Sequence, residues 1–316
     1  MNPTLTASGL FDAQCLPLRL RWLAGRSGQS RLLEPANARF PGMALVGYLN
    51  FVHPNRVQIL GNAEVDYLRR LPDTDRATAI QNLFTCATTT MVVVANDETI
   101  DADLLQAADA ASLPLLVSAL PGPKVIEYLQ HYLTRALAAR TTLHGVYLEV
   151  MGLGVLLTGE SGIGKSELAL ELLSRGHRLI ADDAVELSLT APTVLIGRCP
   201  NLLRDFLEVR GLGILNVRVM FGDTAVRPEK TLRLIVRLEQ LEPDKMAKLD
   251  RLQAVQQTRT VLDVDIPEVV LYVAPGRNLA VLVEAATRSH ILRMRGVNPL
   301  EELMQRQQAS MARDNP

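Results

Sequence analysis

The sequence has few cysteines and almost no net charge. Its three cysteines, Cys15, Cys86 and Cys199, are odd in number and lack the paired spacing of metal ligands. Neither a disulfide framework nor a zinc site is therefore predicted, and we interpret the three as small apolar residues. The formal net charge of −1 over 316 residues gives no electrostatic footprint for nucleic acid or an anionic membrane. We expect a protein or small-molecule partner instead.

The sequence also lacks long hydrophobic runs. No stretch approaches the roughly 20 consecutive apolar residues that span a bilayer. The first residues, MNPTLTASGL, do not have the basic and then apolar segments of an export signal. We therefore expect a cytoplasmic protein with no membrane partner.

A phosphate-binding motif, G-x-x-x-x-G-K-[ST], is present at residues 159–166. The apolar run Leu153 to Leu157 before it predicts a buried strand. Apolar residues at helical spacing over 168–173 predict a helix that ends near Gly176. Strand, glycine-rich loop and helix thus occur in the order that nucleotide binding requires, whereas the alternative is an ordinary glycine turn.

The chemistry of this loop follows from its residue types. Its backbone N–H groups and the helix N-terminus can surround phosphates. Lys165 can reach the outer phosphates, and the hydroxyl of Ser166 can bind Mg²⁺. The predicted nucleotide-binding residues are Gly159, Glu160, Ser161, Gly162, Ile163, Gly164, Lys165 and Ser166.

Two adjacent aspartates, Asp182 and Asp183, follow the predicted helix closely. The run Arg178 to Ala181 before them predicts a second strand, and parallel strands joined by a helix end at the same edge of a sheet. Both carboxylates should therefore lie beside the loop. There, one can help to position a metal and the other can accept a hydroxyl proton. The alternative is a solvated pair at a strand end.

The chain has the α/β patterning of two domains. In the first half, strands are predicted over 43–48, 56–60, 91–96 and 113–118, and helices near 75–86 and 101–111. A helix over 121–140 connects this half, which has no nucleotide motif, to the second. In the second half, strands are predicted over 233–238 and 268–274, and helices over 279–294 and from 299 onward. We place the domains at 1–130 and 131–316.

Several motifs occur in the order and spacing of one bacterial family. They are HGV at 144–146, the loop-to-aspartate segment at 159–183, LEVRGLGILNV at 207–217 and VAPGRN at 273–278. Together they resemble the HPr kinase/phosphorylase family, and FPGMALVGYLNFVHPNRVQILG at 40–61 is similar to that family's N-terminal domain. The resemblance covers nearly the whole chain.

This resemblance implies a bifunctional enzyme. It would phosphorylate a serine of the phosphocarrier protein HPr with ATP and Mg²⁺, or with pyrophosphate in related proteins. Inorganic phosphate would remove the seryl phosphate again and give pyrophosphate. The implied architecture is a C-terminal phosphate-loop kinase domain resembling phosphoenolpyruvate carboxykinase, a separate N-terminal α/β domain of open regulatory or assembly role, and a homohexamer.

The same resemblance implies roles for individual residues. Lys165 would stabilise charge on the transferred group, and Ser166 and Glu208 would hold Mg²⁺. Asp183 would act as the base toward serine and as the acid in the reverse direction. Asp182 would be a supporting ligand or a neighbour of the reacting groups.

His144, Arg251 and Arg277 complete the implied catalytic set, and each has an ordinary alternative. His144 could be a turn or packed residue, Arg251 a solvated residue of a charged helix, and Arg277 a surface arginine. On its Pro-Gly turn, Arg277 could also present a guanidinium fork to phosphate. Glu208 and Arg210, two positions apart on a predicted strand, could instead form a surface ion pair.

Two other functions remain open from the residues alone. The first is a phosphate-loop kinase that acts on a small metabolite. The second is a nucleotide-dependent switch that binds partners without modifying them, although paired aspartates beside the loop favour phosphoryl transfer.

Overall fold

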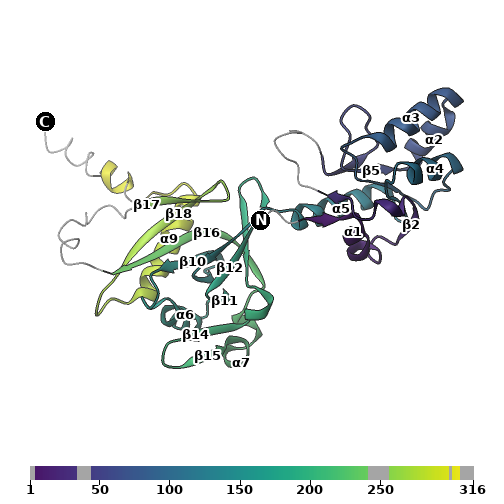
Figure 1. The fold of residues 1–316 in the computed structure, drawn as a ribbon. Coiled ribbons are helices and arrows are strands. Elements are labelled where there is room, and N and C mark those ends of the chain that lie inside the picture. The colour runs from purple at the N-terminus through teal and green to yellow at the C-terminus, as the bar shows by residue number, and fades with distance from the viewer. Residues whose placement is uncertain (1–3, 34–43, 241–255, 299–300, 307–316) are drawn as a thin grey trace, which may run out of the picture. The chain divides into compact units, whose positions relative to one another are not determined.

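The computed structural model describes residues 4–33, 44–240, 256–298 and 301–306. The chain forms two compact units, Met1–Ala139 and Arg140–Pro316 (Figure 1). The domain boundary predicted near residue 130 falls inside helix α5 (Gly122–Ala136). This helix packs against the first unit along its length, so the first unit extends beyond residue 130. Within the described ranges, no helix is long and apolar enough to cross a membrane.

The N-terminal unit contains a five-stranded sheet in the order β2-β7-β6-β5-β4. Its central strands, β5 (Val57–Leu60), β6 (Met91–Val94) and β7 (Leu115–Ser118), are parallel and buried along their whole length. Their sequences are nearly continuous apolar runs because both faces of the sheet are covered. At the edges, β4 (Val46–Tyr48) is parallel to β5, and β2 (Leu20–Ala24) is antiparallel to β7.

Helices cover both faces of this sheet. Side chains of α1 (Ala7–Gln14) and α5 pack in one apolar cluster. Those of α2 (Asn62–Arg70), α3 (Asp73–Thr85) and α4 (Ala102–Ala110) pack in the other. A 3₁₀ turn, η1 (Arg26–Gly28), and the short pair β1 (Leu5–Thr6) and β3 (Leu32–Leu33) complete the unit. The strands and helices predicted for this half are confirmed, with shorter strands than expected.

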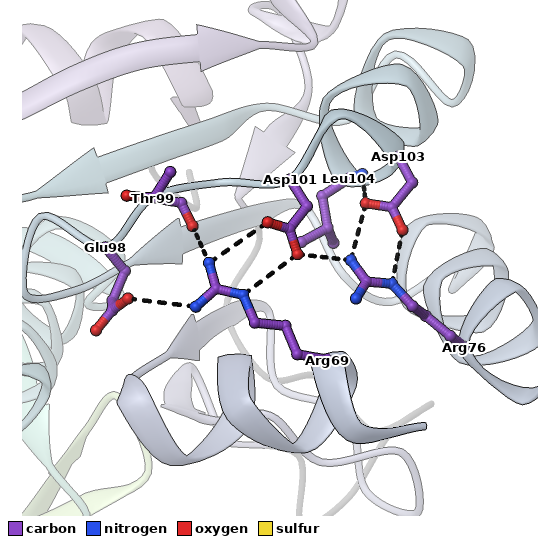
Figure 2. Close-up of polar contacts among 7 residues, drawn as sticks. All are labelled: Arg69, Arg76, Glu98, Thr99, Asp101, Asp103 and Leu104. Carbon is purple, nitrogen blue, oxygen red and sulfur yellow. Dashed lines mark hydrogen bonds and ion pairs between the residues drawn. The ribbon is translucent and has the colours of Figure 1, made fainter. Parts of the chain in front are cut away.

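An ion-pair network ties the three helices of the second face together (Figure 2). Arg76 of α3 donates to both oxygens of Asp103 and, at 2.7 Å, to Asp101 at the start of α4. Arg69 of α2 contacts Asp101 and Glu98 and donates to the carbonyl of Thr99. The hydrogen bonds from Arg76 lower the pKa of both Asp101 and Asp103 below the ordinary range.

The C-terminal unit contains a nine-stranded sheet. The main path runs β11-β9-β10-β16-β13-β12-β8, and β17 and β18 extend it beside β16. Its strands are β8 (Arg140–His144), β9 (Val146–Val150), β10 (Leu153–Gly159), β11 (Arg178–Ala181), β12 (Ala184–Ala191), β13 (Val194–Arg198), β16 (Glu229–Gln240), β17 (Gln256–Val261) and β18 (Val264–Val273).

Three of these strands, β10, β16 and β18, are parallel and end at one edge of the sheet. β11 runs in the same direction as β10, as the sequence predicts, but the antiparallel strand β9 lies between them. The antiparallel insertion was not predicted, because a strand that is buried on both faces gives no periodic signal for its direction.

One face of the sheet is covered by α6 (Lys165–Ser174) and α9 (Leu279–Met294), whose apolar residues share a core cluster with it. The hairpin β14 (Phe206–Val209) and β15 (Gly213–Asn216) packs into the same cluster. Two 3₁₀ turns, η2 (Asn201–Leu203) and η3 (Asp223–Ala225), and α7 (Val217–Phe221) flank the hairpin. The helix predicted over 279–294 is confirmed, and of the one predicted after 299, residues 301–306 are helical.

Two side chains at the end of α6, Arg175 and His177, hold α9 in place. Arg175 and His177 contact the carboxylate of Glu284, with atoms 2.8–3.0 Å apart. The hydrogen bond from Arg175, joined by that of His177, lowers the pKa of Glu284 to about 2. The helix that follows the phosphate loop is thus fixed at its far end.

We predict that Arg76→Met lowers the free energy of unfolding of the N-terminal unit by about 1–2 kcal/mol at neutral pH. The two aspartates have lowered pKa values, so their contribution is complete above their ordinary pKa and is lost as pH falls through the folded value. The difference between variant and wild type should therefore shrink below about pH 4. Trp22, the single tryptophan, lies in this unit and reports its unfolding by fluorescence in the full chain.

The matched control is Arg70→Met, which changes an exposed arginine at the end of the neighbouring helix α2. It should leave the unfolding free energy within about 0.5 kcal/mol of wild type. A difference for Arg76→Met that stays constant down to pH 3 would show that its side chain acts through packing, not through the aspartates.

Candidate active site

The phosphate loop joins β10 directly to α6, as its motif predicts. Gly159, the last residue of β10, has a φ of 142°, and a Cβ added there would lie 2.6 Å from the carbonyl oxygen of Leu238. Gly164 caps α6 with a φ of 100°. Both positions require glycine because an L side chain would be strained or would collide with backbone.

The cationic side chains of the site lie against this loop. Lys165 donates from Nζ to the carbonyl oxygens of Gly159 and Glu160, at 2.9 and 2.8 Å. A Cβ added at Gly162 would lie 3.4 Å from Nη1 of Arg210, so the Arg210 guanidinium also approaches the loop. Positive charge therefore reaches the loop from two separate segments of the chain.

The two aspartates form the turn between β11 and β12. Asp183 has a left-handed φ of 62°, and its carbonyl accepts a hydrogen bond from the N–H of Gly145 at 3.1 Å. The N–H of Ala184 donates to the carbonyl of Asp182 at 2.8 Å, which makes the turn tight. Asp tolerates the left-handed region better than most residues, so the residue type suits this position.

The aspartates of this turn lie in opposite environments. Asp182 is 8% exposed, and its Oδ2 accepts the backbone N–H of Glu208 at 2.8 Å. Burial raises the pKa of Asp182; hydrogen bonds from the backbone of Glu208 and Asp183 oppose this effect in part, whereas the charges of those two residues add to it. The side chain of Asp183 is 80% exposed. Asp183 is thus the carboxylate that an incoming molecule can reach.

His144 lies beside the exposed aspartate. It ends β8, where it is paired with Ala184 of β12. Its Nδ1 is 3.7 Å from Oδ1 of Asp183, and its side chain is 84% exposed. The predicted alternative of a packed histidine is therefore wrong, because the histidine side chain points to solvent at the site.

The hairpin β14-β15 carries Glu208 and Arg210 to the same place. Glu208 lies on β14, exposed, opposite Ile214. Arg210 lies in the turn that follows and not on the strand that the sequence suggested, because β14 ends at Val209 and Leu212 donates back to the Val209 carbonyl. Gly211, with a φ of 86°, allows the tight turn.

These segments enclose a cavity of about 620 Å³. It is lined by most of the predicted loop residues and by every described residue of the predicted catalytic and metal sets except Arg277. The predicted residues among its lining are His144, Gly159, Ser161, Gly162, Gly164, Lys165, Ser166, Asp182, Asp183 and Glu208. Segments separated by more than 60 positions in the sequence thus form one site.

Three of the predicted residues that the structure describes are not part of the lining. Glu160 and Ile163 belong to the loop but do not line the cavity. Arg277 is exposed in the turn between β18 and α9, where its Nη1 donates to the Tyr272 carbonyl at 3.4 Å. This turn lies at the sheet edge where β10 also ends. Arg251 lies outside the described residues.

The lining also contains residues that were not among the predicted site residues, and Glu167 and Gly145 are two of them. Glu167 is exposed in the first turn of α6 and directly follows the motif. This adjacency to the motif is the sequence feature that could have indicated its place at the site. Gly145 is buried, and its N–H binds the aspartate turn. Its φ of 155° and the 2.3 Å from an added Cβ to the Leu157 carbonyl explain the glycine in the HGV motif.

The metal ligands that the sequence analysis suggests for the cavity are all oxygen donors. The Ser166 hydroxyl and the carboxylates of Glu208 and Asp182 line it together. Mg²⁺ prefers oxygen ligands and usually binds through one or two carboxylates together with waters and substrate phosphates. In the described part of the chain, no group of three or more His, Cys, Asp or Glu residues could hold a metal alone. These oxygen atoms therefore fit a Mg²⁺ ion that would also be bound by a phosphate group of the substrate.

Comparison with known proteins gave matches in both halves of the chain. Residues 5–133 match the family described as HPr Serine kinase N terminus, and residues 135–307 match HPr Serine kinase C-terminal domain. An HPr kinase/phosphorylase of Chromobacterium violaceum is 49% identical over 304 residues, which are 96% of this chain and 95% of that protein. One from Xylella fastidiosa is 48% identical over 318 residues, which cover 100% of each.

A solved structure, described as the Hpr(Ser) kinase/phosphatase from Coxiella burnetii, aligns with 49% of this chain and 93% of its own, at 38% identity and a TM-score of 0.46. The two family matches together include all the segments that form the cavity. With relatives at close to half identity along its whole length, the chain belongs to the HPr kinase/phosphorylase family.

Proposed function

We propose that the protein phosphorylates a serine of HPr with ATP and removes the same phosphate with inorganic phosphate. The relatives described above bear the name HPr kinase/phosphorylase, and their similarity extends over the whole chain. The observation that carries the proposal is the position of an exposed carboxylate, Asp183, in the cavity formed by the phosphate loop. A phosphate-binding loop alone would support nucleotide binding, whereas a reachable carboxylate beside it supports transfer to a hydroxyl.

In the forward direction, the loop and Lys165 hold the outer phosphates of ATP. The serine oxygen of HPr attacks the γ-phosphorus, and the bond between this phosphorus and the β–γ bridging oxygen breaks, which releases ADP. Asp183 accepts the hydroxyl proton. The ring of His144 lies beside this carboxylate, with its Nδ1 3.7 Å from Oδ1 of Asp183. Ser166 and Glu208 would hold Mg²⁺, which would supply positive charge beside the phosphates.

In the reverse direction, the same carboxylate is protonated at the start. An oxygen of inorganic phosphate attacks the phosphorus of phosphoserine, and the bond to the seryl oxygen breaks. Asp183 gives its proton to that oxygen, and pyrophosphate leaves. Microscopic reversibility assigns both proton transfers to one residue. Pyrophosphate can serve as phosphoryl donor by the reverse of this step.

Other parts of the proposal rest on the family likeness. We include a cytoplasmic location, a homohexamer, a regulatory or assembly role for the N-terminal domain, and likeness of the C-terminal domain to phosphoenolpyruvate carboxykinase. We also assign a catalytic role to Arg251. The parallel strands that end at the phosphate loop support a kinase of this type. A metabolite kinase and a non-catalytic switch are the alternatives that the first experiment distinguishes.

Incubation of the full chain with HPr, Mg²⁺ and γ-labelled ATP tests this function. We expect the label on a serine of HPr, located by mass spectrometry. Lys165→Ala should lower the rate by about 100-fold or more, because it removes the cation at the outer phosphates. An unlabelled HPr would exclude the protein kinase, and near-normal turnover of a correctly melting Lys165→Ala would place the site elsewhere.

Asp183→Asn tests the shared acid and base. The amide keeps the side-chain shape but cannot accept the serine proton, so phosphorylation and phosphorolysis should both fall, by about 100-fold or more. Nucleotide affinity should stay within about two-fold, since Asp183 contacts the acceptor side. Initial rates in both directions and a fluorescent-nucleotide titration measure these outcomes. Loss of only one direction would contradict the shared role.

Arg277→Ala separates the two directions. The turn that carries Arg277 lies at the sheet edge of the phosphate loop but outside the cavity lining, which suits contact with inorganic phosphate or phosphorylated HPr. We expect phosphorolysis to fall about 10- to 100-fold and phosphorylation to fall less. The measurement is the pair of initial rates on one enzyme preparation. Equal losses would make Arg277 a general docking residue, and no loss would make it a surface arginine.

A further inference from the structure

A second cavity lies in the N-terminal unit, between the helices α3 and α4. Its volume is about 850 Å³, which is larger than that of the cavity at the phosphate loop. Small-molecule sites in proteins usually measure about 300–1,000 Å³ and have largely apolar walls with a few polar groups. The two linings share no residue, so this cavity is separate from the candidate active site.

The walls of this cavity are formed mainly by small apolar side chains. Four alanines of the two helices and the α4 C-cap line it: Ala77, Ala107, Ala110 and Ala111. Ile80 and Phe84 of α3 also line it, at 4% and 3% exposure, and both belong to the core cluster that joins α3 to the sheet. The space therefore lies over a packed apolar floor, and its walls do not fill it.

An ion pair spans the gap between the two helices at one end of the cavity (Figure 2). Arg76, near the start of α3, and Asp103, near the start of α4, both line the cavity, with Nε and Oδ2 2.7 Å apart. A helix of a partner protein, about 10 Å wide with its side chains, could not continue past this bridge. The cavity is thus suited to a molecule of limited length.

One nitrogen of Arg76 is available to such a molecule. Nε and Nη2 donate to Asp101 and Asp103, whereas Nη1 contacts no polar group among the described residues (Figure 2). The side chain is only 16% exposed, and the two carboxylates hold its guanidinium plane in place. Nη1 carries two N–H groups, and a poorly hydrated donor without an acceptor is unfavourable. An oxygen atom of a ligand would satisfy it.

The charges of the lining favour an uncharged ligand. Two negative residues and one positive residue line the cavity: Asp73, Asp103 and Arg76. An anion would meet an excess of negative charge, and a cation would lie beside the free Nη1 of Arg76. The uncharged polar residues of the lining, all of them exposed, are Gln81, Thr85 and Gln106. Their amides and hydroxyl can donate to and accept from neutral polar groups.

We propose that this cavity binds an uncharged small molecule that has an apolar body and a carbonyl oxygen. The body lies against the alanines of both helices, and the oxygen accepts a hydrogen bond from Nη1 of Arg76. This binding site is independent of the phosphoryl transfer proposed above.

The probe for the test is prodan, an uncharged naphthalene that carries a ketone and emits more strongly, and at shorter wavelength, in apolar surroundings. Titration of the full chain, with ATP and Mg²⁺ present to occupy the other cavity, should give a saturable, one-site rise in emission. Ala77→Phe and Ala110→Phe each place a ring in the cavity from an exposed position. Each should weaken prodan binding at least about 10-fold.

Arg76→Met removes the proposed donor and should weaken prodan binding about 3- to 10-fold, as expected for one lost hydrogen bond. The matched control for the ring variants is Thr78→Phe, which changes an exposed residue next to Ala77 on the same helix but outside the lining. Its affinity for prodan should stay within about two-fold of wild type. Unfolding followed by Trp22 fluorescence without the probe verifies that each variant is folded, and Ala110→Phe serves where Ala77→Phe is not.

Absence of saturable prodan binding to wild type overturns the proposal. Unchanged affinity in the folded ring variants, or an equal loss in Thr78→Phe, also overturns it. Unchanged affinity in Arg76→Met rejects the hydrogen bond to the carbonyl oxygen.

The anion 8-anilinonaphthalene-1-sulfonate, of similar size, tests the charge of the ligand. It should bind this cavity at least about 10-fold more weakly than prodan. Equal or tighter binding that the ring variants abolish rejects the uncharged class. If sedimentation shows that a ring variant loses an oligomer that wild type forms, the cavity is an interface between copies of the chain and the proposal fails.

Discussion

The buried carboxylate of Asp182 accepts the backbone N–H of Glu208, and this hydrogen bond joins two separate segments of the candidate site. One is the turn that exposes Asp183 beside His144. The other is the hairpin that carries Glu208 to the cavity. Because Asp182 is buried and bonded to backbone, replacing its carboxylate would leave a buried N–H unpaired, which is costly. This hydrogen bond therefore holds the two segments together beside the cavity.

The sheet explains why these segments meet the phosphate loop. β11 and β12 lie far apart in the strand order, but only Asp182 and Asp183 connect them, so the sheet must curve to bring its ends together. The cluster of buried residues that includes Tyr147, Ile180, Val185 and Leu195 fills the space within this curve. Close packing of this interior holds the turn at a fixed distance from the loop.

The two compact units differ in their layering and in where their polar groups lie. In the N-terminal unit, helices cover both faces of a buried parallel sheet, and its ion pairs connect helix to helix (Figure 2). In the C-terminal unit, polar groups gather where parallel strands end and the loop begins. Sheets with parallel strands bind ligands at such edges, because backbone groups and helix N-termini are free to face a ligand there.

The sequence by itself determined the phosphate loop, both aspartates, the parallel strands of both large sheets and helices α3, α4, α5, α6 and α9, but it did not predict α1, α2, α7 or about half of the strands that the structure describes. The signals of the predicted features are local: glycine where φ is positive, apolar runs in strands, and helical spacing after Lys165. Only the tertiary structure decided that β9 lies between β10 and β11, that Asp182 is buried while Asp183 is exposed, and that Arg210 reaches the loop. These features arise from contacts between residues distant in the chain, and adjacent identical residues give no sequence signal for which one is buried.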